Sequence, residues 1–387
     1  MIDRENTRSN RNERNDALGK YTPEFVDLKI ARKYSDTPET IDLSQAKDIS
    51  ESAARILGES RHPLPLDGLV FLSPRIARAL VRHSSPISFG GLLDLPEKIA
   101  RILSHHDDKI LLNGLKHLSV ETAEALSSHR GTLAFRGLKR ISVEAANAIS
   151  QNDGALLLNG ITRLPENAAK GLARHRGTLQ LNGLPSLSAT AAGALANHRR
   201  NLHLNGLLEF SPEVAGGFAS HRGSLHLGGI TRLSAATARA LQSHKGTLHL
   251  PALKRIPIRL ATILAEHRGH LEIEIHSRLP EQTLLALIKH RPAIRFDNLT
   301  TITPTVARAL AARRFNHLCE GLASDFEDAT QALDNDEPRL NLDSLTHLSA
   351  ACARELATHP GTVSLKGLLH PNSPSAKWLR RLAANRC

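Results

Sequence analysis

Hydrophobic and polar residues alternate along the chain in short segments that recur every 23 residues. Clear examples are Leu179 with Leu181, and Leu202 with Leu204. Alternation with a period of two predicts a short β-strand with one buried face. Glycine follows the strand in most repeats, where the backbone must turn sharply out of the strand. These glycines are Gly114, Gly137, Gly160, Gly183, Gly206 and Gly229.

The second half of each repeat has the pattern of a helix. Small residues and a leucine recur at helical spacing, as in Ala191, Ala192 and Leu195. The tripeptide His-Arg-Gly, as at 175–177, is expected to end the helix with its glycine in a left-handed turn. Serine or proline occupies the expected N-cap position. These residues are Ser119, Ser142, Ser188, Ser211, Ser234, Ser349, Pro96, Pro165, Pro257 and Pro280.

Histidine marks one position of the repeat and makes the register easy to follow. It stands at positions 83, 106, 129, 175, 198, 221, 244, 267, 290 and 359, and Asn152 fills one gap. The register runs without insertion from about 37 to 381, which is about fifteen repeats. One strand and one helix cannot close a core alone, so neighbouring repeats must stack. We therefore predict an α/β solenoid of about fifteen 23-residue strand–helix units, with a parallel sheet on one face.

The repeat has the consensus LxLNGLxxLSxxxAxALAxHRGT, seen best from Leu179 to Thr190 and from Leu202 to Ser224. It resembles the bacterial leucine-rich repeats over roughly nine tenths of the chain. In that family the repeat asparagine stands two residues past the second strand leucine, whereas Asn182 follows Leu181 directly. The resemblance implies a leucine-rich-repeat-like binding scaffold, usually for proteins, and it names no particular partner.

The two ends of the chain differ from its middle. Residues 1–20 are polar and are expected to form a disordered tail. Within 21–36, Thr22-Pro23-Glu24 is expected to open a capping helix out of phase with the repeats, which would fill 37–381. Residues 370–387, with Trp378, are expected to cap the other end. The unit 313–335 is the most degenerate and acidic repeat, which leaves a local kink and a binding site as open interpretations.

Composition restricts the class of protein. Only 3% of the 387 residues are aromatic, which agrees with a thin core of alanine and leucine layers. The first residues lack the apolar region of a secretory signal, and no stretch approaches the ~18 apolar residues of a membrane-spanning helix. We expect a cytoplasmic protein without membrane contact. Export through a specialised system, as a host-directed bacterial effector, stays open.

No motif of a catalytic site is present in a suitable strand-to-helix setting, so the chain is not expected to be an enzyme or to carry a cofactor. The three cysteines have no CxxC spacing, which argues against a disulfide framework or a zinc ribbon. Cys319 and Cys352 fall at core positions and are expected to be buried. The repeated histidine is interpreted as a structural cap of the helix end, with a metal-binding or pH-sensing column as the alternative.

The net charge of +12 makes anionic partners a candidate class. The position after the repeated histidine is basic in a continuous run, which we call the basic ridge. Its members are Arg176, Arg199, Arg222, Lys245, Arg268, Arg291 and Arg314. Spaced about 5 Å apart on stacked repeats, these charges would suit a nucleic acid or an acidic polysaccharide. The alternative is that each is a solvated residue that interacts favourably with its own helix dipole.

The exposed face of the sheet gives the leading candidate for partner binding. Histidines stand between the strand leucines on three successive strands, and carboxylates follow on the next strand. We call these residues the sheet-face site: His203, His226, His249, His270, Glu272, Glu274 and Asn205. Histidines ~5 Å apart are too widely spaced to share one ion without rotamer adjustment, although two of them with a carboxylate could chelate zinc or a similar divalent ion. We interpret the patch as a polar binding surface and predict no metal site. We expect a protein partner here, with polyanion binding along the basic ridge as the alternative.

Overall fold

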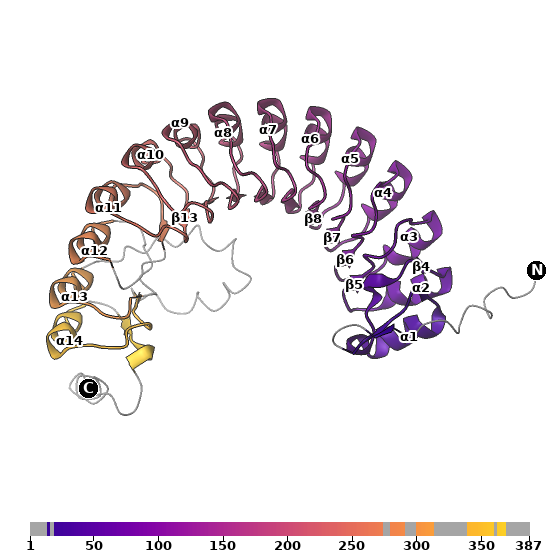
Figure 1. Ribbon diagram of the computed structural model, residues 1–387, viewed down its shortest axis with the longest axis horizontal. Coiled ribbons are helices and arrows are strands. Elements are labelled where there is room, and N and C mark those ends of the chain that lie inside the picture. The colour runs from indigo at the N-terminus through magenta and orange to yellow at the C-terminus, as the bar shows by residue number, and fades with distance from the viewer. Residues whose placement is uncertain are drawn as a thin grey trace, which may run out of the picture. The chain divides into compact units, whose positions relative to one another are not determined.

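The computed structural model describes residues 14–15, 19–273, 279–290, 299–312, 339–359 and 362–368. The chain divides into two compact units, unit 1 (Met1–Leu207) and unit 2 (Leu208–Cys387). Each unit alternates short parallel strands with helices of two turns (Figure 1). The predicted α/β architecture of strand–helix repeats is therefore confirmed.

In unit 1 the helices are offset by one repeat and each contacts the next. Figure 1 shows them side by side as one layer, with the strands forming the other layer. The helices are α1 (Leu28–Asp36), α2 (Glu51–Glu59), α3 (Pro74–Leu80), α4 (Glu97–Leu103), α5 (Val120–Leu126), α6 (Val143–Ile149), α7 (Glu166–Leu172) and α8 (Ala189–Leu195).

The strands of unit 1 are very short. Those from β5 to β11 pair in parallel, each residue with the one 23 positions later, as in Leu179 with Leu202. The strand leucines that face the helices are buried. The strands are β1 (Arg14–Asn15), β2 (Tyr21–Thr22), β3 (Phe25–Val26), β4 (Asp48–Ile49), β5 (Leu64–Pro65), β6 (Ile87–Ser88), β7 (Ile110–Leu111), β8 (Leu133–Ala134), β9 (Leu156–Leu157), β10 (Leu179–Gln180) and β11 (Leu202–His203).

Unit 2 repeats the same plan. Strand β12 pairs in parallel with β13, and β13 with β14, in the 23-residue register. Strands β15 and β16 form a second parallel pair. The elements are α9 (Pro212–Gly217), α10 (Ala235–Ala240), α11 (Ile258–Ala265), α12 (Glu281–Ile288), α13 (Pro304–Ala311), α14 (Ala350–Leu356), β12 (Leu225–His226), β13 (Leu248–Leu250), β14 (Leu271–Ile273), β15 (Arg339–Asn341) and β16 (Thr362–Ser364).

The first helix differs from the sequence prediction. It begins at Leu28, with the Asp27 side chain accepting a hydrogen bond from the Ile30 backbone N–H, and not near Thr22. Strand β3 precedes it and pairs in parallel with β4. Helix α1 is therefore in phase with α2, 23 residues later, and forms part of the repeat series. The predicted tail, 1–20, and the predicted cap, 370–387, lie almost wholly outside the described residues.

The stacking order of the repeats changes between α13 and α14, although the 23-residue register is kept. These helices contact each other directly although two repeat periods separate them. The guanidinium of Arg308 donates two hydrogen bonds to Glu355, at 2.7 and 3.0 Å, and the Thr346 backbone N–H donates to Thr300 O at 3.0 Å. The degenerate acidic unit 313–335 lies outside the described residues. The sequence pattern could not reveal that α14 packs directly on α13, because the two helices are still separated by a multiple of 23 residues along the chain.

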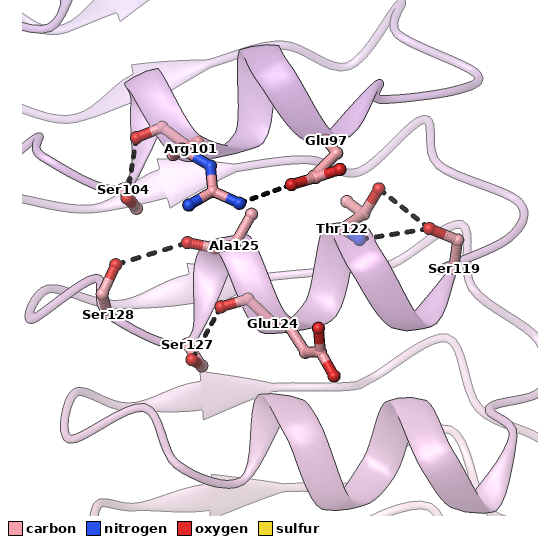
Figure 2. Close-up of polar contacts among 9 residues, drawn as sticks. All are labelled: Glu97, Arg101, Ser104, Ser119, Thr122, Glu124, Ala125, Ser127 and Ser128. Atoms are coloured by element: carbon pink, nitrogen blue, oxygen red, sulfur yellow. Dashed lines mark hydrogen bonds and ion pairs between the residues drawn. The ribbon is translucent and has the colours of Figure 1, made fainter.

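Serine side chains cap the N-termini of many helices, and at α5 and α6 serines also bind carbonyls at the C-terminal end. Ser119 Oγ accepts the Thr122 backbone N–H at 3.1 Å at the start of α5, as predicted (Figure 2). After the last turn, Ser127 and Ser128 donate to the carbonyls of Glu124 and Ala125 (Figure 2). These bonds satisfy backbone groups that have no partner within so short a helix. Where proline takes the N-cap place, as before α4 and α7, the side chain makes no capping bond.

The glycine of His-Arg-Gly has a different role from the one predicted. Neither Gly131 nor Gly177 has a positive φ, so no left-handed turn requires glycine there. A Cβ atom at Gly177 would lie 2.1 Å from Gly154 O, and one at Gly131 would lie 2.3 Å from Asp108 O. Glycine is needed because consecutive repeats approach each other closely at this turn. The helices end at the leucine three residues before the histidine.

A ladder of asparagine side chains joins neighbouring repeats in the turns that follow the strands. Asn182 Oδ1 accepts a hydrogen bond from the Asn205 backbone N–H at 3.0 Å, and Asn159 Oδ1 accepts from Asn182 N at 3.1 Å. Aspartate takes this role in two repeats, where Asp67 Oδ1 accepts from the Gly90 backbone N–H and Asp343 Oδ1 accepts from that of Lys366. The acceptor always serves the residue 23 positions later. Moving the asparagine to follow the strand leucine directly therefore preserves a repeat-to-repeat bond.

The repeated histidines form a second, buried ladder. Their exposed fractions are at most 4%, and successive imidazoles lie parallel, with centroids 6.3 Å apart for His83 and His106 and 5.5 Å apart for His244 and His267. His267 Nδ1 lies 3.2 Å from Leu241 O, and His290 Nδ1 lies 3.2 Å from Ala265 O. The imidazole therefore meets a helix-end carbonyl, as expected of a cap, but the carbonyl belongs to the preceding repeat.

Burial controls the protonation of the histidine ladder. Removal from water lowers the imidazole pKa, while nearby backbone carbonyls act in the opposite direction. For His244, burial together with the neighbouring His267 lowers the pKa to about 3. The other ladder residues with a lowered pKa are His83, His106, His129, His175 and His267. These six histidines of the ladder are therefore uncharged at neutral pH.

Candidate functional site

The sheet-face site in unit 2 is built by three adjacent strands. His226 lies on β12 between two buried leucines, and His249 occupies the same place on β13. Glu272 takes this place on β14. Because side chains alternate across a strand, burial of the leucines directs these three polar side chains to the opposite face of the sheet. The parallel register places His249 directly beside Glu272.

The two imidazoles of this site are stacked. The ring centroids of His226 and His249 lie 3.7 Å apart with an interplanar angle of 12°. This spacing is much shorter than the 5.5 Å between His244 and His267 in the buried ladder. Face-to-face contact covers one face of each ring.

Glu272 fixes one of these rings. His249 Nδ1 lies 2.7 Å from Glu272 Oε2, and the two side chains are 14% and 24% exposed. The contact is an ion pair when the imidazole is protonated and a hydrogen bond when it is neutral and Nδ1 carries the proton. A partly exposed pair of this kind contributes little to stability, typically ~0.2–1 kcal/mol. Its main effect is to orient the imidazole.

His270 immediately precedes β14 and is half-buried. Burial lowers its pKa, and the negative charge of Glu272 acts in the opposite direction. Glu272 therefore influences two imidazoles, His249 through a direct contact and His270 through its charge. The predicted association of histidines and a carboxylate on this face thus has a defined geometry in unit 2.

The remaining predicted members of the sheet-face site are placed differently. His203 lies on β11 of unit 1, in register with Gln180. The backbone N–H of Asn205 takes part in the asparagine ladder. Glu274 lies outside the described residues. In the described part of the chain, no cluster of three or more histidine, cysteine or acidic residues has the geometry to hold a metal ion.

Each described residue of the basic ridge comes directly after a histidine of the buried ladder. Its described members in unit 1 are exposed, as are those in unit 2, whereas the histidine before each of them is buried. These exposed members are Arg176, Arg199, Arg222, Lys245 and Arg268. Arg291 and Arg314 lie outside the described residues. The structure therefore places the described ridge residues in solvent, at the ends of successive helices.

An exposed apolar cluster in unit 1 was missed by the sequence analysis. Val70, Phe71 and Leu93 are 69%, 70% and 60% exposed and lie in the turns that follow β5 and β6. The sequence did contain a sign of this cluster. Val70 and Leu93 stand at the same position of consecutive repeats, 23 residues apart, and each directly follows a buried leucine. The cluster lies outside the strands that carry the sheet-face site.

The buried cysteine was predicted correctly. Cys352 is 1% exposed, and its thiol lies 3.3 Å from the Ile302 carbonyl oxygen. Cys319 lies outside the described residues. Within the described part of the chain, no helix combines the length and apolar character needed to cross a bilayer.

No protein-family model matches the chain, and no curated protein matches it. Among solved structures, a leucine-rich-repeat protein of Leptospira interrogans is 16% identical, with 86% of this chain and 98% of that chain covered and a TM-score of 0.33. An internalin from Listeria monocytogenes is 12% identical over 74% of this chain and 79% of that chain, with a TM-score of 0.38. The Toll–Spatzle complex of Drosophila is 14% identical over 66% and 44%, with a TM-score of 0.32. The 23-residue parallel register of strands and helices within each unit is that of the leucine-rich-repeat-like solenoid predicted from the sequence.

Proposed function

We propose that this protein is a non-enzymatic scaffold that binds a protein partner through the sheet-face site of unit 2. The observation that carries the proposal is the arrangement of His226, His249 and Glu272 on three adjacent strands. One imidazole is stacked on the second, and the second is held by the carboxylate. His270 extends the same polar surface.

The arrangement suits recognition because it is fixed before binding. The strands set the spacing, the register sets the neighbours, and the contact with Glu272 limits the rotamers of His249. Binding then costs less conformational entropy than it would if the side chains of the site had to be ordered at the same time. The imidazoles are only partly exposed, so a partner would contact the outer part of the surface that they form with Glu272.

The basic ridge supports a second candidate function, binding of a nucleic acid or an acidic polysaccharide. The supporting observation is the exposure of its described members at equivalent places in successive repeats. Such binding would weaken steeply as salt concentration rises, because it releases counterions. Binding at the sheet-face site would respond less to salt. A role as a host-directed effector is compatible with either surface.

A capture experiment tests the leading proposal. Tagged full-length protein and the double variant His226→Ala/His249→Ala are incubated with native lysate at moderate salt, with nuclease present, and bound proteins are quantified. The proposal expects a defined protein on the wild-type chain that is depleted on the double variant, while the thermal unfolding midpoint of that variant stays close to wild type. Equal recovery on both chains would contradict it.

A further inference from the structure

A second surface of unit 1 has the character of a ligand site. A groove of about 670 Å³ lies between the C-terminal ends of α7 and α8. Five of the residues that line it are cationic and none is acidic. The cationic residues are Lys170, Arg174, Arg176, Arg199 and Arg200. Only Arg176 and Arg199 belong to the basic ridge, and the other three converge from neighbouring positions.

Most of this charge has no counterpart on the protein. Lys170 forms an ion pair with Glu166 at 2.6 Å. Within the described residues, none of the four arginines lies within 4.0 Å of a carboxylate. Two helix C-termini supply a partial negative charge of only about half an electron each. The positive charge around the groove therefore exceeds what the helix ends balance.

Arg200 departs from the repeat in a way that packing does not explain. Between Gly131 and Gly269, all of the other repeats have glycine at the equivalent turn position. At Gly177 a Cβ atom would lie 2.1 Å from a carbonyl of the preceding repeat, so a side chain at this position requires local adjustment. Residues that break a local rule without a structural gain are typical of functional sites. At position 200 the chain carries an arginine that lines the groove.

Two other grooves between neighbouring helices of the described chain have fewer cationic lining residues. The groove between α11 and α12, of about 580 Å³, includes Glu266 beside Arg268 and Lys289. The groove between α3 and α4, of about 400 Å³, is lined by three cationic residues, Arg78, Lys98 and Arg101, and Arg101 pairs with Glu97. The α7–α8 groove therefore has more cationic lining residues, five, than either of these two grooves.

We propose that the groove between α7 and α8 binds a compact anion that carries two or more phosphate groups. Arginine suits this ligand because its planar guanidinium donates paired hydrogen bonds to phosphate oxygens. Four arginines around one groove can contact several phosphates of one molecule. The site is separate in sequence and chemistry from the sheet-face site, so neither proposal depends on the other.

Calorimetric titration of the full-length protein with inorganic tripolyphosphate at moderate salt tests the proposal. Saturable binding to one site is expected. Arg174→Ala should weaken binding about tenfold or more, because it removes charge-assisted hydrogen bonds. Arg200→Gly should weaken it similarly, and its unfolding midpoint should equal or exceed that of wild type because it restores the repeat glycine. The matched control Arg268→Ala/Lys289→Ala, in the α11–α12 groove, should bind like wild type.

Three results would overturn the proposal. The first is absence of tripolyphosphate binding to the wild-type chain. The second is equal weakening by the α7–α8 and α11–α12 variants, which would indicate diffuse attraction along the basic ridge. The third is binding of a short DNA duplex, with the same dependence on Arg174, when tripolyphosphate neither binds nor competes, which would identify a nucleic-acid surface. Competition by tripolyphosphate for the same arginines supports the compact-anion site.

Discussion

His249 Nδ1 lies 2.7 Å from Oε2 of Glu272, on the neighbouring strand. The two residues stand 23 positions apart and are register partners in the sheet. Their contact joins two partly exposed side chains into one oriented pair, and His226 stacks on the same imidazole. The candidate protein-binding surface of unit 2 is centred on this relationship.

Removal of the carboxylate should affect recognition more than stability. Glu272→Gln keeps a side chain of similar size but loses the charge that orients His249. We expect the free energy of unfolding to change by less than about 1 kcal/mol, because the pair is partly exposed. Urea unfolding of the two proteins measures this change. A loss of several kcal/mol would show that the pair is part of the fold.

The stability of the protein should fall in mild acid because of the histidine ladder. Burial holds the pKa of His244 at about 3, against 6.5 without the fold, and lowers that of His267 in the same direction. Below pH 6.5 the unfolded chain takes up protons that the folded chain does not, so His244 costs about 1 kcal/mol of stability by about pH 5.5, and His267 acts in the same direction. Above pH 6.5 the effect fades, and it is negligible by about pH 7.5.

Urea unfolding at about pH 7.5 and about pH 5.5 checks the acid effect. Its matched variant is His244→Asn, since Asn152 already occupies the equivalent buried place in another repeat. This variant should lose less stability between the two pH values than wild type does. Equal stability of the wild-type protein at both pH values would contradict the account of the ladder.

Two glycines should respond in opposite directions to the same substitution. Gly177→Ala would place Cβ 2.1 Å from Gly154 O and should destabilise the protein by about 2 kcal/mol. Gly193 lies in α8 with no heavy atom within 4 Å of the Cβ position, so Gly193→Ala should stabilise by about 0.5–1 kcal/mol. Thermal unfolding of both variants provides the comparison. Destabilisation by both would argue against close contact between repeats as the reason for Gly177.

The asparagine ladder depends on an acceptor atom and not on the amide group. Asn182→Ala should cost about 1 kcal/mol, because the Asn205 backbone N–H loses its partner. Asn182→Asp keeps the acceptor and should cost less, since Asp67 already serves Gly90 in this way at 2.6 Å. Denaturant unfolding of the two variants separates these cases. Equal losses would assign the stabilisation to the amide N–H group.

The repeat architecture was largely predictable because each element depends on local sequence. Alternating leucines indicated the strands, and Ser119 and its equivalents indicated where helices start. Features that depend on the next repeat were not predictable in detail. The pattern identified Gly177 but could not distinguish a left-handed turn from a close carbonyl contact, and the direct packing of α14 on α13 left the spacing unchanged.

The candidate site was predictable in position only. Period-two alternation placed His226, His249 and Glu272 on one face of successive strands. Their stacking and pairing depend on rotamers, which the sequence pattern does not specify. The cationic groove between α7 and α8 escaped notice because its residues come from different positions of two repeats, and only Arg200 breaks the pattern visibly.

The most direct test of the central claim is quantitative capture with three full-length baits: wild type, the triple variant His226→Ala/His249→Ala/Glu272→Gln, and the groove variant Arg174→Ala. All three should show similar unfolding midpoints. We predict a defined protein partner that binds wild type and the groove variant equally and is lost from the triple variant. Retention of every captured protein by the folded triple variant would contradict the proposal that the sheet-face site binds a protein.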